Sequence, residues 1–154
     1  MDKITTESGK WSLISNIWIW LANLLAILAS ITSFLGIFFE GTYSRETRAW
    51  AVQGIGQDYA NLIVIFILLM CNYFLSKNSF KAYLVWLGTL IYFIYSFVIY
   101  AFFLHFNFLF LAYVSILGLS FYILLGSLIG INLSKYQDSF FPSQTGKSEP
   151  SADF

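Results

Sequence analysis

The sequence predicts an all-α fold, a transmembrane four-helix bundle. Of its 154 residues 58% are apolar and only 10% are charged, whereas an ordinary soluble domain carries about 25% charged residues. The charges are also segregated, since the runs 11–39, 59–76 and 82–134 contain no Asp, Glu, Lys or Arg. The 21% aromatic content excludes general disorder. The net charge of zero argues against a nucleic-acid-binding protein.

The three charge-free runs account for four helices. A hydrocarbon core about 30 Å thick needs roughly 20 apolar residues in helical form, so the first two runs hold one helix each. The third run has 53 residues and accommodates two helices, joined by a turn at His105–Asn107. The runs are continuously apolar instead of alternating, which favours helices over β-barrel strands. We therefore expect helices at about 13–39, 58–76, 82–104 and 108–134.

The segments outside these helices predict the orientation in the membrane. We expect a polar leader at 1–12 and a polar, disordered tail at 135–154. Six lysines lie in these termini and between the second and third helices, against two arginines, Arg45 and Arg48, in the first loop. The positive-inside rule then places both termini in the cytoplasm of a multi-pass cell-membrane protein. Four tryptophans lie near the cytoplasmic helix ends, where we expect an interfacial belt: Trp11, Trp18, Trp20 and Trp86.

The cysteine and histidine counts narrow the chemistry. Cys71 is the single cysteine of the chain, which argues against an enzyme that uses a redox pair of cysteines. His105 is the single histidine, which argues against a bis-histidine haem site and against a metal site. We therefore predict neither a cofactor nor a metal ion.

Small residues in the last predicted helix point to close helix packing. Gly118, Gly126 and Gly130 share one face, and the last two form a GxxxG element. Such elements let helix backbones approach each other in lipid. One interpretation packs this face inside the bundle against Ala22 and Ala26 of the first helix. The other uses it for a homodimer or for contact with another membrane subunit.

Polar residues converge on the outer face in the predicted topology. Tyr92, Tyr95 and Tyr100 form either a seam that sets helix register or the wall of a ligand cavity. Asp58 stands where an N-cap is expected, or else faces that cavity. No acidic or basic residue lies deep in a predicted helix, which argues against a proton-coupled pump. The candidate mouth of the cavity comprises Gln53, Gln57, Asp58, Tyr92, Tyr95, Tyr100, His105 and Asn107.

Two stretches carry a resemblance to a known family. The first is AWAVQGIGQD at 49–58, and the second begins with LVWLG at 84–88 and continues through the tyrosines and Phe106-Asn107 to Tyr113. Together they resemble an uncharacterised family of prokaryotic polytopic integral membrane proteins. That family has no assigned activity, so the resemblance implies a membrane fold and no catalytic residue. It also implies relatives that continue with further hydrophobic segments.

Three function classes follow from these observations. The sequence favours a structural or interaction subunit of a membrane assembly, which would use the GxxxG face. One alternative is a small transporter, channel, or lipid- or ligand-binding protein with an outward-facing cavity. The other is a membrane enzyme with an acid–base pair at the outer face, formed by Asp58 and His105. In each case the lipid bilayer is a partner and nucleic acid is not.

Overall fold

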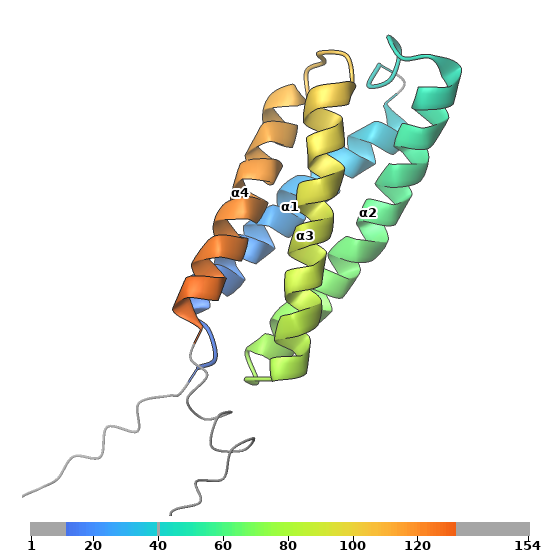
Figure 1. Ribbon diagram of the computed structural model, residues 1–154. Helices are drawn as coiled ribbons and strands as arrows, with labels where there is room; N and C mark the ends of the chain where they lie inside the picture. The colour runs from blue at the N-terminus through green and yellow to red at the C-terminus, as the bar shows by residue number, and fades with distance from the viewer. Residues whose placement is uncertain (1–11, 40, 132–154) are drawn as a thin grey trace, which may run out of the picture.

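The described part of the chain forms four helices, which run antiparallel to their neighbours in a bundle (Figure 1). The computed structural model describes residues 12–39 and 41–131. Trp11, most of the predicted leader and the whole of the predicted polar tail at 135–154 therefore lie outside the described residues. All four helices are long and apolar enough to span a membrane, which confirms the all-α four-helix class and fits a multi-pass integral membrane protein. The helices are α1 (Asn16–Phe38), α2 (Arg48–Leu75), α3 (Phe80–Phe103) and α4 (Phe110–Gly130).

The helices form a closed ring, because α1 packs on α2 and α4, and α3 packs on the same two helices. The connections 41–47 and 104–109 lie together at one end of the bundle (Figure 1). We call this the outer end, after the predicted orientation. The start of α1, the end of α4 and the α2–α3 connection lie at the other, inner end.

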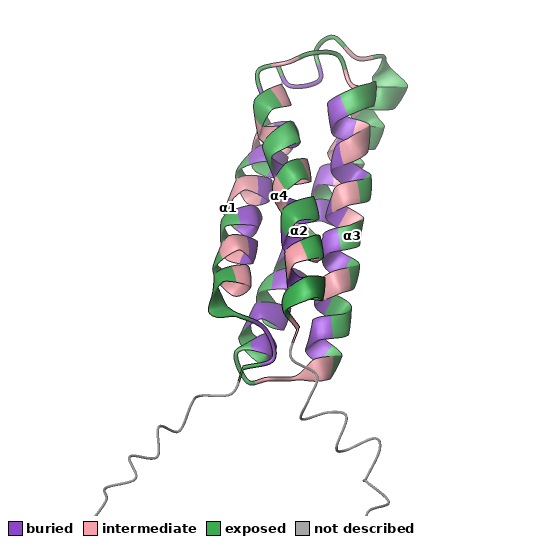
Figure 2. Ribbon diagram, turned by 60° about the vertical axis from the view of Figure 1, so that its left-hand side comes forward, coloured by how far each residue is buried: buried purple, intermediate pink, exposed green. Residues whose placement is uncertain are grey.

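The bundle is apolar outside and partly polar inside. Figure 2 shows buried residues facing the bundle interior and exposed residues facing away from it. Large apolar side chains are widely exposed, among them Phe66, Phe102 and Ile129, which is the arrangement that contact with lipid tails requires. Several buried positions are polar instead: Thr32, Ser33, Asp58, Asn61, Asn72, Thr89, Ser96, Ser120 and Ser127.

α2 begins ten residues earlier than the expected start at 58. Its N-cap is Thr47, whose side chain accepts a hydrogen bond from the Trp50 backbone N–H. Asp58 therefore lies three turns inside the helix, and its predicted N-cap role is wrong. A prediction based on apolar runs misses these first turns, because they contain the charged Arg48 and two glycines, Gly54 and Gly56. The 28 residues of α2 extend for about 42 Å, so the helix is longer than a hydrocarbon core about 30 Å thick requires.

A small polar cluster ties three helices together near the inner end. Asn72 of α2 donates to Asn23 Oδ1 of α1 at 2.8 Å and accepts from Trp86 Nε1 of α3 at 2.8 Å. Trp86 is fully buried, so its predicted place in an interfacial belt is wrong. A Trp N–H inside a bundle needs an acceptor, and Asn72 supplies it. Trp20, by contrast, is 72% exposed.

The glycines of α4 differ in their surroundings. A Cβ at Gly126 would collide with the ring of Trp18 from α1, so the missing side chain allows that ring to pack against α4. Gly130 lies near the same ring, whereas a Cβ at Gly118 would meet open space. Gly126 thus serves α1–α4 packing inside the bundle. Homodimerisation through this helix stays a prediction.

Candidate functional site

The most unusual group in the bundle is the carboxylate of Asp58, which is only 3% exposed. Two phenols hold it from different elements. Tyr43, in the segment after α1, donates to Oδ2 at 2.7 Å, and Tyr100 of α3 donates to Oδ1 at 2.9 Å. Each carboxylate oxygen therefore has one short hydrogen bond from a neutral donor. Short charge-assisted bonds of this kind are the strong ones in proteins.

Space for this carboxylate comes from Gly36 of α1. A Cβ built on Gly36 would coincide with the carboxylate of Asp58 and would also press on the Tyr43 hydroxyl. The acid therefore lies directly against the backbone of α1. Any other residue at position 36 would displace it, which makes Gly36 part of the site although it contributes no functional group.

Two further polar groups lie beside Asp58 without a hydrogen-bond partner in the described part of the chain. They are Ser33 Oγ, one turn before Gly36 on α1, and Asn61 Nδ2, one turn after Asp58 on α2. Both residues are fully buried. A buried polar atom without a partner costs about 1–3 kcal/mol, so such atoms persist where another requirement selects them.

A second layer of hydrogen bonds links α2 to α3 next to this carboxylate. Gln57 Nε2 donates to the Tyr92 hydroxyl at 2.7 Å and to Ser96 Oγ at 3.1 Å. The Tyr92 hydroxyl in turn donates to Asn61 Oδ1 at 3.0 Å. The network thus surrounds Asp58 with neutral polar side chains of α2 and α3.

No basic side chain neutralises Asp58 within residues 12–39 and 41–131, where the one ion pair joins His105 and Glu46. The phenol of Tyr43 lies outside the helices, and burial together with the charge of Asp58 raises the pKa of Tyr43 above its ordinary value. Tyr43 therefore remains a hydrogen-bond donor at physiological pH. The described residues also contain no group of three His, Cys, Asp or Glu side chains placed to hold a metal ion.

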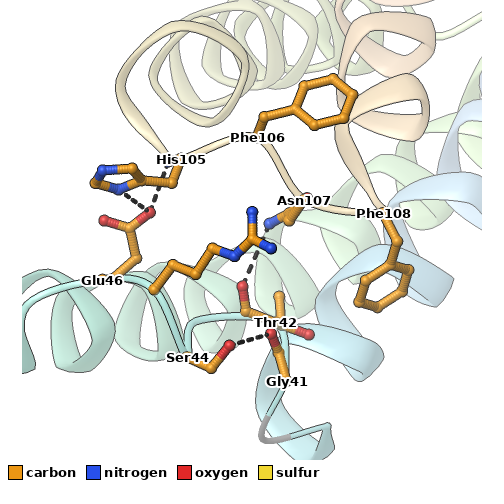
Figure 3. A pocket seen from close by; sticks show the side chains of 9 residues that line it. Gly41, Thr42, Ser44, Glu46, His105, Phe106, Asn107 and Phe108 are labelled. Carbon is orange, nitrogen blue, oxygen red and sulfur yellow. Dashed lines mark hydrogen bonds and ion pairs between the residues drawn. The ribbon is translucent and has the colours of Figure 1, made fainter.

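A pocket of about 350 Å³ lies at the outer end, between the segments 41–46 and 105–108 (Figure 3). Glu46 Oε1 accepts from the His105 backbone N–H at 2.7 Å and lies 3.2 Å from the His105 ring Nδ1. Asn107 Nδ2 donates to the Thr42 carbonyl oxygen at 3.3 Å. These bonds tie the two outer connections together.

A narrower cleft of about 40 Å³ lies between α2 and α3. Gln57, Ser96 and Tyr100 line it, so it touches both the second hydrogen-bond layer and a phenol that binds Asp58. A water molecule needs roughly 10–15 Å³ of such space. The cleft therefore has room for water next to the buried network. Its remaining lining residues are Trp50, Gln53, Gly54, Ile99 and Leu104.

The eight predicted mouth residues divide into groups. Asp58 and Tyr100 belong to one buried hydrogen-bonded cluster, and Gln57 and Tyr92 belong to a second, half-buried cluster beside it. Gln53 lines the adjoining cleft. His105 and Asn107 line the outer pocket. Tyr95 belongs to neither.

Tyr95 is 66% exposed and faces away from the bundle. A spacing of three residues turns a helix by about 300°, which takes Tyr95 off the face that Tyr92 presents to Gln57. His105 pairs with Glu46 and not with Asp58. The geometry therefore does not assemble the predicted acid–base pair.

Sequence reasoning did not identify four residues of the site: Ser33, Gly36, Tyr43 and Asn61. Asn61 could have been predicted from the sequence. Asp58 and Asn61 are three residues apart and share one helix face once α2 is extended to Arg48. Tyr43 and Gly36 carry no such signal, since their roles depend on how the first connection folds back over α2.

No family model matches this chain, and no curated protein or solved structure matches it. The resemblance of the two sequence stretches to a family of polytopic membrane proteins stays a prediction.

Proposed function

We propose that this protein binds and releases a proton at Asp58, as a small ion-handling membrane protein of the transporter or ligand-binding class. The observation that carries the proposal is a 3% exposed carboxylate, held by two phenols, with no ion-paired cation in the described part of the chain. An ionisable side chain inside a membrane-spanning bundle is costly and is by default a functional candidate.

The hydrogen bonds around Tyr100 accommodate both protonation states. The Tyr100 hydroxyl lies 2.9 Å from Asp58 Oδ1 and 3.2 Å from the Gly54 carbonyl oxygen. When Asp58 is ionised, the phenol donates to the carboxylate. When Asp58 is protonated, the acid can donate to the phenol oxygen and the phenol can donate to Gly54. Proton uptake then needs a turn of one hydroxyl and no movement of heavy atoms.

In the described part of the chain, the cleft that touches the partners of Asp58 lies toward the outer end. The cleft beside Tyr100 has room for water at that end. Toward the inner end, the buried positions of α2 between Asn61 and Asn72 are Ile65, Leu68 and Cys71. On α2, this apolar stretch separates the outer network from the inner polar cluster. The arrangement favours a one-sided binding site, as in one state of a transporter, over an open channel.

The test is infrared difference spectroscopy of the protein in lipid nanodiscs as the pH is changed. We expect a carbonyl band of a protonated carboxylic acid that appears on acidification and is absent in Asp58→Asn. Glu46→Gln is the matched control, because Glu46 is the acid of the outer pocket, and this variant should retain the band. A pH-dependent band that survives in Asp58→Asn would refute the proposal.

Proton flux distinguishes transport from binding. The protein is reconstituted in liposomes that enclose a pH-sensitive dye, and a pH gradient is applied in each direction. Flux that Asp58→Asn abolishes and Glu46→Gln retains indicates a transporter. A band without flux indicates a binding protein that takes up protons from one side.

A further inference from the structure

The outer pocket contains a cation that the described residues leave unpaired. Arg45 lines the pocket of about 350 Å³, is exposed, and makes no hydrogen bond or ion pair with any described residue. The adjacent Glu46 makes no ion pair with Arg45, and its Oε1 lies against the backbone N–H and the ring of His105 instead. The N–H donors of the guanidinium are therefore available to a ligand.

Neutral polar groups line the pocket together with Arg45 and Glu46. Ser44, Thr42 and the Asn107 amide line the same pocket. The Ser44 and Thr42 hydroxyls donate to the carbonyl oxygens of Gly41 and Leu35. The Asn107 amide donates one N–H to the Thr42 carbonyl oxygen, and its second N–H is a donor of the kind that binds a phosphate oxygen. A planar guanidinium matches two oxygens of a phosphate at once. The chemistry of the pocket thus fits a phosphate group.

The rim of the pocket indicates where that phosphate comes from. Phe106 and Phe108 line the pocket and are 71% and 59% exposed. Phe39 packs edge-on against Phe108 at a ring-centroid distance of 5.5 Å and is also exposed. These rings lie at the outer end, beside the apolar surface that faces lipid, where aromatic side chains contact the interfacial region of a bilayer. Free phosphate in water would gain nothing from them.

We propose that the outer pocket binds the phosphate of a phospholipid headgroup from the leaflet at that end, with Arg45 as its principal ligand. The acyl chains then run past Phe106 and Phe108 along the bundle. A lipid held there contacts both outer connections, which the His105–Glu46 and Asn107–Thr42 bonds already join. The lipid site is separate from Asp58. A failure of the lipid-binding test would therefore leave the proposed proton binding unaffected, and the reverse also holds.

The test measures binding of a short-chain phosphatidylglycerol to the purified full-length chain in detergent by isothermal titration calorimetry. Arg45→Gln removes the charge, and Arg48→Gln is the matched control, because Arg48 is an exposed arginine that does not line the pocket. A hydrogen bond to a charged group contributes about 1.5–3 kcal/mol. We therefore expect Arg45→Gln to weaken binding at least about tenfold and Arg48→Gln to bind like the wild type.

Two results would overturn the proposal. One is an equal affinity of the Arg45→Gln and Arg48→Gln variants, which would mean that the lipid binds elsewhere. The other is competition by inorganic phosphate at the concentration that saturates with phosphatidylglycerol, which would identify free phosphate as the ligand. Thermal unfolding followed by a thiol-reactive dye at the buried Cys71 confirms that both variants are folded before they are compared.

Discussion

The inner and outer halves of this bundle both bury polar side chains, but they do so differently. In the inner cluster Asn72 joins Asn23 and Trp86, and every partner is neutral and paired. The outer network contains a carboxylate and leaves Ser33 Oγ and Asn61 Nδ2 without partners. A fully paired neutral cluster is what structural cohesion requires. A charge with unpaired neighbours costs stability, which points to a role other than cohesion.

Replacement of Trp86 in the inner cluster should have the largest effect on stability. Trp86→Ala empties a fully buried site and leaves Asn72 Oδ1 without a donor, so we expect a loss of about 3 kcal/mol or more of unfolding free energy. Unfolding in mixed micelles with increasing SDS measures it. Trp20→Ala, at a 72% exposed position, is the control and should change little. Equal effects of the two variants would contradict the cohesive role of the inner cluster.

Gly36→Ala should be the most damaging small change in the outer network. The added methyl group would displace the Asp58 carboxylate from α1, and such overpacking typically costs about 1–3 kcal/mol. The same variant should weaken or remove the pH-dependent carboxylic-acid band in nanodiscs. Gly88→Ala is the matched control, because a Cβ at Gly88 meets nothing within 4 Å. Retention of both the stability and the band in Gly36→Ala would show that the site does not depend on this contact.

The helices of this bundle were predictable from the sequence to a greater extent than its buried polar contacts. The four helices follow from charge-free runs, because the length of apolar helix needed to cross a membrane leaves few alternatives. The start of α2 was placed at 58 instead of Arg48 because apolar runs record where lipid touches a helix, not where its hydrogen bonds begin. With the helix start at 58, Asp58 was expected at the N-terminus of the helix and its burial could not be predicted. Trp86 was misplaced for a related reason, since depth along a helix does not say which face a residue occupies.

The site was predictable only in part. Gln57, Asp58, Tyr92 and Tyr100 were among the predicted mouth residues. They lie in two adjacent hydrogen-bonded clusters, Asp58 with Tyr100 and Gln57 with Tyr92. Tyr43 was not, because its contact with Asp58 depends on the path of the segment after α1. Such contacts arise from loop closure, which no helical periodicity encodes.

A third comparison tests the two halves with nearly isosteric changes. Asn72→Leu leaves Trp86 Nε1 and Asn23 Oδ1 unpaired, and we expect it to cost about 1–2 kcal/mol. Asp58→Asn removes a buried charge while its amide oxygen can still accept from Tyr100, so stability should be unchanged or higher at neutral pH. SDS unfolding of both variants measures the difference. A larger loss for Asp58→Asn than for Asn72→Leu would mean that the carboxylate serves cohesion after all.

The smallest effect on stability is expected at the contact that closes the outer end. His105→Ala removes a ring that is 69% exposed from a Glu46 side chain that is 6% exposed. Because solvent screens the exposed ring, its interaction with Glu46 contributes little. The backbone N–H of residue 105 can still donate to Glu46, so we expect a loss of at most about 0.5 kcal/mol in SDS unfolding. Replacement of Glu46 removes the acceptor of both contacts, so Glu46→Ala should cost more than His105→Ala. Equal losses of stability in His105→Ala and Glu46→Ala would contradict this expectation. They would mean that the imidazole of His105, and not its backbone N–H, makes the stabilising contact with Glu46.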